Sequence, residues 1–146
     1  SKCLGWSNDF HRRGCDLLIV VHDSDGNDPA AIEAKIADKL LSSPIVNRYI
    51  CIPVQELESW LLCDPVGLQR SLSLNRVPKI NGFPESFDSP KELLEEHIYL
   101  CSEKEIIYTT KLNGLIAENI SVERMKVRSP SFSKFYDFIK SQTYIS

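Results

Sequence analysis

The sequence predicts an α/β fold with parallel strands, because two apolar runs flank a helical segment in its first half. Residues 17–22 and 49–54 are short runs rich in Val and Ile, which are typical of strands buried on both faces. Between them, Asp28 and Pro29 suit a helix start, since Asp caps helices and Pro is tolerated at the first helical position. A strand, a helix and a strand within about 40 residues predict a parallel pair with a right-handed crossover.

The helix between the two strands has a clear apolar face. Ile32, Ile36 and Leu40 fall four residues apart, which places them on one side of a helix that Pro44 ends. Residues 1–16 show weaker helical spacing, and we expect them to form a helix that stops at Gly14.

The second half of the chain is predicted to be helical, as a cover on the sheet. Expected helices are 55–63, one opening at Asp64-Pro65, 90–99, 111–128 with a break near Asn119, and one opening at Ser129-Pro130. Residues 73–89 should form an ordered loop, because turn residues alternate there with apolar ones. Ser89 and Glu92 have capping-box spacing. In the last helix, Phe132, Phe135 and Tyr136 begin an apolar stripe that should dock on the core.

Length and composition indicate one compact domain over residues 1–146. A formal net charge of −3 does not indicate a chain coated for nucleic acid or a membrane surface. The five cysteines are odd in number and form no Cys-x-x-Cys, which argues against a zinc ribbon or a disulfide framework. No signal peptide or long apolar span is visible, so we expect a cytoplasmic protein without membrane contact.

Acidic residues follow both predicted strands and form the main candidate site. Asp23 and Asp25 come directly after the first strand, and Glu56 and Glu58 follow the second. Ligands of open α/β sheets bind beyond the carboxyl ends of the strands, and clustered carboxylates favour Mg²⁺ or Mn²⁺. Glu56 and Glu58 are two apart on a predicted helix, so they cannot easily reach one ion together, and we favour Glu58. The alternative is that these acids only cap helices and turns.

Basic residues gather near the C-terminus. The segment from Arg124 to Lys140 carries five bases and one acid. Arg124, Lys126, Arg128 and Lys134 could hold a nucleic-acid backbone without reading its sequence. A solvated helix face is the alternative interpretation.

Four sequence blocks, in this order, resemble a TOPRIM-like bacterial family of domains of unknown function, related to the TOPRIM half of OLD-type nucleases. The blocks are Val20–Gly26, Val54–Pro65, Ser89–Leu94 and Arg128–Phe132. The resemblance covers about residues 17–140. Its specific parts are Glu-x-Trp-Leu-Leu-x-Asp-Pro and Arg-Ser-Pro-Ser-Phe, whereas Asp-x-Asp is shared with many folds.

The resemblance implies a Rossmann-like TOPRIM sheet flanked by helices. It also implies a divalent-metal-dependent nuclease, which is a hydrolase, with DNA as the first expected substrate. It implies that Asp23, Asp25 and Glu58 bind Mg²⁺ or Mn²⁺ and take part in catalysis, with Lys91 as a further catalytic residue. It also implies an ABC/AAA-type ATPase partner and a role in antiviral defence against phage.

The sequence departs from the TOPRIM pattern at one position. TOPRIM enzymes carry an essential Glu at the end of an earlier strand, but the first Glu here is Glu33. We therefore expect a TOPRIM-like domain that lacks its first strand at the N-terminus. One alternative is a non-catalytic sensor or scaffold subunit of an ATPase complex. Another is a haloacid-dehalogenase-like phosphatase with Asp23 as nucleophile, although Asn27 replaces the usual Thr or Val and no later Asp-Asp pair is present.

Overall fold

The structure, a computed structural model, describes residues 2–142 and combines a small parallel sheet with many helices. The two strands are β1 (Leu17–Val21) and β2 (Asn47–Cys51), joined by helix α2 (Pro29–Lys39). They pair in parallel from Leu17 opposite Asn47 to Val21 opposite Cys51. The predicted strand–helix–strand unit is therefore confirmed, and with it the mixed α/β class.

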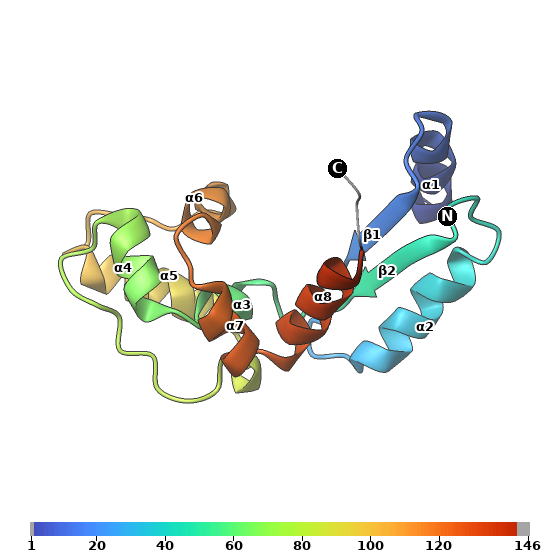
Figure 1. The fold of residues 1–146 in the computed structure, drawn as a ribbon. Coiled ribbons are helices and arrows are strands. Elements are labelled where there is room, and N and C mark those ends of the chain that lie inside the picture. The colour runs from blue at the N-terminus through green and yellow to red at the C-terminus, as the bar shows by residue number, and fades with distance from the viewer. Residues whose placement is uncertain (1, 143–146) are drawn as a thin grey trace.

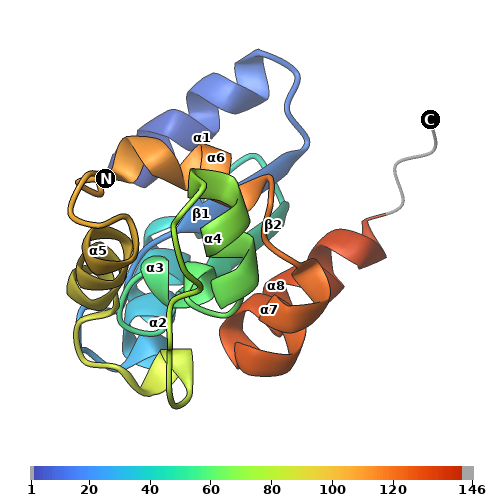
Figure 2. The same ribbon diagram turned by 90° about the vertical axis from the view of Figure 1, so that its left-hand side faces the viewer.

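The remaining elements are helical and lie on both sides of this unit. They are α1 (Lys2–Arg12), α3 (Glu58–Leu61), α4 (Pro65–Leu72), η1 (Pro84–Ser86), α5 (Pro90–Cys101), η2 (Thr110–Leu112), α6 (Asn113–Ala117), α7 (Val122–Arg128) and α8 (Pro130–Ser141). Figure 1 shows α1, α2 and α8 around the strands and α3 to α7 gathered at the other end of the molecule. From the helical end, Figure 2 shows the strands lying behind α3 and α4.

Two apolar cores correspond to these two ends. The smaller core joins Leu18 of β1 to Ile36 of α2 and to Leu40, the residue that caps the end of α2. The larger core contains the fully buried Leu68 and Leu94 and spans the helical end. The second half of the chain therefore brings its own core, and covers the sheet mainly through α8.

The prediction that both faces of the first strand are buried is wrong. Leu18 is buried, but Ile19 and Val21 on the opposite face are 36% and 48% exposed. That face is covered by α8 at β2, where the ring of Tyr49 stacks on Phe138 with centroids 4.6 Å apart. An apolar run therefore reports strand formation here but overstates burial, because α8 packs on β2 and leaves this face of β1 exposed.

Among residues 2–142, proline starts four of the α-helices, as predicted, but the capping differs. Asp28 accepts a hydrogen bond from Ala30 N at 3.1 Å at the start of α2. The expected capping box at Ser89 is absent, since Ser89 makes no side-chain cap bond to α5. Instead, Glu56 Oε2 accepts a hydrogen bond from Lys91 N at 2.8 Å. A distant carboxylate thus replaces the local cap.

Within residues 2–142, every helix is too short or too polar to cross a lipid bilayer.

Candidate functional site

The chain segments that leave β1 and β2 are joined side by side, which builds the base of the site. Asp23 Oδ1 accepts a hydrogen bond from Leu57 N at 2.9 Å, and Ser24 Oγ accepts one from Gln55 N at 2.7 Å. Asp25 N donates to Gln55 O at 2.9 Å. The two segments therefore stay hydrogen-bonded side by side beyond the strands, and we call this region the polar junction. The polar junction holds Asp23 and Asp25 at the carboxyl end of the sheet.

Two residues of this junction have a left-handed backbone. Asp25 has φ 47° and Gln55 has φ 62°, and Gly26 follows at 77°. Side-chain-bearing residues enter this region at a cost in energy, which is smaller for Asp than for a longer residue such as Gln. Such conformations cluster at functional sites. The strain at Asp25 and Gln55 turns the two chain segments outward, toward a common pocket.

We call this depression the acidic pocket; its volume is about 660 Å³. It lies between the strand ends and the start of α5, and it is lined by Asp25, Gly26, Gln55, Glu56, Asp88, Ser89, Lys91, Glu92 and Glu95. Five of these residues carry a carboxylate and one carries an ammonium group. The hydrogen bond from Lys91 N to Glu56 joins its two walls.

Asp23 does not line the pocket and is half-buried. Burial raises the pKa of the Asp23 carboxyl group above its ordinary value, and the hydrogen bond from Leu57 opposes this shift. The negative charges of Glu58, Asp25 and Glu56 raise the pKa further. The carboxylates that follow the two strands therefore lie close enough to repel one another.

Glu58 is placed differently from the prediction. It is 5% exposed and does not line the acidic pocket. Its Oε1 accepts a hydrogen bond from the Tyr108 hydroxyl at 2.8 Å, and Asn113 Nδ2 lies 3.5 Å away. Burial and the hydrogen bond to Glu58 raise the pKa of Tyr108. The carboxylate of Glu58 thus has partners in the helical core.

Glu56, the less favoured of the two acids that follow the second strand, lines the pocket. The expected helix 55–63 begins only at Glu58, because Gln55 is left-handed and cannot be helical. Glu56 therefore belongs to a turn rather than a helix, and the helical spacing argument does not apply to it. Lys91 also lines the pocket.

The donor set suits a hard divalent cation, but no complete ligand set is preformed. Across the described residues 2–142, no group of three or more His, Cys, Asp or Glu side chains is placed to hold one ion. Mg²⁺ usually takes one or two carboxylates and fills its other positions with water and substrate oxygens. Asp25 and Glu56, both carboxylates at the pocket wall, fit that pattern of ligation.

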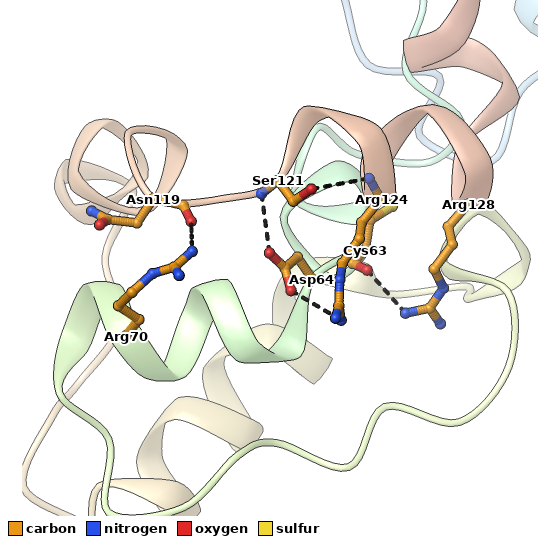
Figure 3. A network of polar contacts seen from close by, with 7 residues as sticks. All are labelled: Cys63, Asp64, Arg70, Asn119, Ser121, Arg124 and Arg128. Carbon is orange, nitrogen blue, oxygen red and sulfur yellow. Dashed lines mark hydrogen bonds and ion pairs between the residues drawn. The ribbon is translucent and has the colours of Figure 1, made fainter.

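Both arginines predicted to hold nucleic acid have partners within the chain, and Figure 3 shows them. Arg124 Nη1 lies 3.3 Å from Asp64 Oδ1. Arg128 donates from Nη1 to Cys63 O at 3.0 Å and from Nη2 to Gly82 O at 2.8 Å.

The two lysines of that set are placed at α7 and α8. Lys126 Nζ lies 4.4 Å from the ring centre of Tyr136 and 3.6 Å from Glu123 Oε2. Lys134 lines a smaller pocket beside β2. A nucleic-acid backbone would therefore meet Lys134 more readily than the two arginines, whose guanidinium groups already bind the chain.

Asp64 is the centre of the network in Figure 3. It is 2% exposed, and Ser121 N donates to its Oδ2 at 3.0 Å. With Arg124 on Oδ1, both carboxylate oxygens face a positive or donor group. Arg70 Nη2 closes the same region by donating to Asn119 O at 2.7 Å. The Asp-Pro of the second sequence block thus has a structural role, joining α4 to α7.

Comparison with known proteins gives one result. No curated protein and no solved structure matches the chain. A family model described as a domain of unknown function, DUF4276, matches residues 11–140. Because this match covers most of the sequence, the chain belongs to the DUF4276 family.

Proposed function

We propose that this chain is the metal-binding domain of a divalent-metal-dependent nuclease with a TOPRIM-like, Rossmann-related sheet. The observation that carries the proposal is the junction of the strand ends, where Asp23 and Asp25 are joined to Gln55 and Leu57 in a strained backbone. Such strain has a purpose when it directs side chains into a pocket. The pocket that results is lined by oxygen ligands of the type that Mg²⁺ and Mn²⁺ prefer.

The charge of the pocket limits what it can bind. Five carboxylates at the wall repel a phosphodiester, and Lys91 alone among the lining residues carries a positive charge. A nucleic acid could enter only with cations that reverse this field. Asp25 and Glu56 would hold a cation, and Asp23 would add negative charge near them. When bound, the cation would activate a water molecule and stabilise charge on the leaving oxygen.

The direct test is a nicking assay on supercoiled DNA with Mg²⁺ or Mn²⁺, run alongside RNA. Asp25→Asn and Glu56→Gln keep the size of each side chain and remove its charge, so each should reduce the rate by about 100-fold or more if these carboxylates hold the cation. Asp38→Asn is the control, since Asp38 is an exposed residue of α2 outside the pocket. Equal rates in Asp25→Asn, Glu56→Gln and the wild-type protein would contradict the proposal.

A non-catalytic role is the second candidate, because no three-carboxylate group is preformed in residues 2–142 and Glu58 binds Tyr108 instead. In that case the domain would act as a sensor or scaffold. Calorimetry with Mn²⁺ separates the two candidates. Binding with cleavage supports the nuclease, and absence of both supports the scaffold. Turnover of an aryl phosphate would instead support the phosphatase alternative.

The family resemblance extends the proposal to an ATPase partner and to defence against phage. The test first asks whether an ABC/AAA-type ATPase is encoded beside this chain, and then co-expresses and purifies the pair and challenges the cells with phage. Loss of protection in Asp25→Asn, with the complex intact, would support a role of the acidic pocket in defence.

A further inference from the structure

A polar cluster joins three segments that are far apart in the chain. It consists of Trp60, Glu85, Ser129 and Ser131, and we call it the Glu85 cluster. Glu85 Oε1 accepts hydrogen bonds from Ser131 Oγ at 2.6 Å, from Ser131 N at 3.0 Å and from the Ser129 hydroxyl. Ser131 Oγ in turn accepts a hydrogen bond from Trp60 Nε1 at 2.8 Å.

Ser131 uses its hydroxyl group fully in this cluster. A serine hydroxyl has one proton to donate, which goes to Glu85, and its lone pairs receive the indole N–H. Ser129 is 0% exposed and Trp60 is 6% exposed, whereas Glu85 and Ser131 are half-buried. Hydrogen bonds to a carboxylate are stronger than neutral ones. The cluster is therefore a firm connection between α3, η1 and the start of α8.

The same segments lead directly to the two walls of the acidic pocket. Trp60 follows Glu56 by four residues, and Glu85 precedes Asp88 by three. Across the pocket, Lys91 N donates to Glu56 Oε2 at 2.8 Å. The contacts therefore form a closed ring. The Glu85 cluster joins α3 to η1, the chain leads from η1 to α5, and the bond between Lys91 and Glu56 leads back to α3.

Arg128 strengthens this ring. Its guanidinium group binds Gly82 O at 2.8 Å, just before η1, and Cys63 O at 3.0 Å, just after α3. The segment Arg128–Ser131 therefore braces both sides of the ring without lining the acidic pocket.

We propose that Ser131, acting through Glu85 and Trp60, is a positioning residue that holds the two walls of the acidic pocket at their spacing. Its loss should free the start of α5 from Glu56 and weaken cation binding at the pocket. The effect on cation binding rests on the proposed function, whereas the effect on the walls does not.

The test compares Ser131→Ala with Ser133→Ala, which removes a hydroxyl two residues further along the same helix and outside the cluster. Amide hydrogen exchange, measured by NMR, reports on the Lys91 N–H that joins the walls. We expect exchange at Lys91 to accelerate about five- to tenfold in Ser131→Ala, as local opening becomes easier, and to stay unchanged in Ser133→Ala. Mn²⁺ affinity, measured by calorimetry on the same samples, should fall by a similar factor in Ser131→Ala alone.

The outcomes separate this proposal from the function. Faster Lys91 exchange with no Mn²⁺ binding to any variant would support the positioning role and contradict the metal site. Unchanged exchange and Mn²⁺ affinity in folded Ser131→Ala would overturn the positioning role. Should Ser131→Ala fail to fold, Glu85→Gln gives the same comparison, because it keeps an acceptor oxygen and removes the charge. Lys91 exchange equal to that of the wild-type protein in Glu85→Gln would then overturn the proposal.

Discussion

Asp64 and the acidic pocket show two ways in which this chain treats carboxylate charge. Asp64 is buried, and Ser121 N and Arg124 each face one of its oxygens. At the pocket, Asp25 and Glu56 stand with three further carboxylates opposite a single ammonium group. Removing one partner of a buried, paired charge such as Asp64 costs stability, whereas most acids of the pocket are exposed and form no ion pair among residues 2–142. The difference separates a structural junction from a candidate site.

The distribution of ion pairs supports this distinction. Among residues 2–142, the ion pairs involve Asp9, Asp64 and Glu123, and no carboxylate of the acidic pocket has one. Lys91 approaches Glu56 through its backbone N–H, so its side-chain charge stays available. The protein could have neutralised these acids with nearby lysines or arginines, as it does at Asp64. Four of the five acids are exposed to solvent, and the proposed cation would replace part of that solvent.

The largest expected effect is at Asp64. Asp64→Ala leaves Ser121 N without its acceptor in a buried position and removes the partner of Arg124. We expect the free energy of unfolding to fall by about 2–4 kcal/mol, measured by urea denaturation. Asp38→Ala, at an exposed site, should change it by less than about 0.5 kcal/mol. Equal stability of the two variants would show that the Asp64 network is not a structural junction.

The next effect is steric and tests how tightly Asp64 is packed. A Cβ at Gly67 would lie 2.6 Å from Asp64 Oδ2 and 3.0 Å from Asn119 O, so Gly67→Ala forces the network apart. We expect a loss of about 1–3 kcal/mol in the free energy of unfolding. Gly114→Ala in α6 is the matched control, since nothing lies within 4 Å of its Cβ position. That variant should gain up to about 1 kcal/mol from helix propensity.

The sequence was sufficient for the parts of the fold that depend on local pattern. The parallel strands, the crossover helix and the starts of α4 and α8 follow from apolar spacing and from Asp or Ser before Pro. The position of Asp23 and Asp25 at the strand ends follows from the same pattern. The second strand was predicted at 49–54 but ends at Cys51, because Pro53 cannot donate to a ladder.

The parts that could not be predicted depend on contacts between distant residues. The helix predicted from residue 55 did not anticipate a left-handed Gln55, whose N and O bond to Ser24 and Asp25. Arg128 looked available for nucleic acid, yet it binds Cys63 and Gly82 across a long sequence separation. A run of basic residues in a sequence does not indicate which of them form hydrogen bonds or ion pairs within the folded chain.

A smaller effect is expected at the arginines of the Asp64 network, and the salt dependence of the stability loss distinguishes one from the other. Arg124→Ala removes an ion pair whose arginine is 54% exposed, so we expect a loss of about 1 kcal/mol that shrinks in 1 M NaCl. Arg70→Ala removes a bond to the neutral Asn119 carbonyl, and its smaller loss should change little with salt. Thermal unfolding at low and high salt measures both. A salt-independent loss in Arg124→Ala would indicate lost packing instead of lost charge.

The smallest effect has the opposite sign and tests the acidic pocket directly. Because burial and neighbouring charges raise the pKa of Asp23 in the folded state, folding favours the protonated acid over the carboxylate. The resulting stabilisation is present below the ordinary pKa of 3.8 and is lost as the pH rises through the higher folded value. At neutral pH the charged Asp23 therefore opposes folding. Asp23→Asn, which keeps an oxygen for Leu57 N, should raise the Tm by about 1 °C at pH 7 and leave it unchanged near pH 3.

Added Mn²⁺ should make the Tm of the wild-type protein higher than that of Asp23→Asn. A cation that binds only the folded state raises the Tm of the wild-type protein, and it should raise the Tm of Asp23→Asn less, since part of the attracting charge is gone. If the wild-type Tm exceeds the Asp23→Asn Tm once Mn²⁺ is added, the charge of Asp23 lowers stability but strengthens cation binding. An equal rise in Tm of the two proteins with added Mn²⁺ would instead indicate that Asp23, like Asp64, has a structural role only.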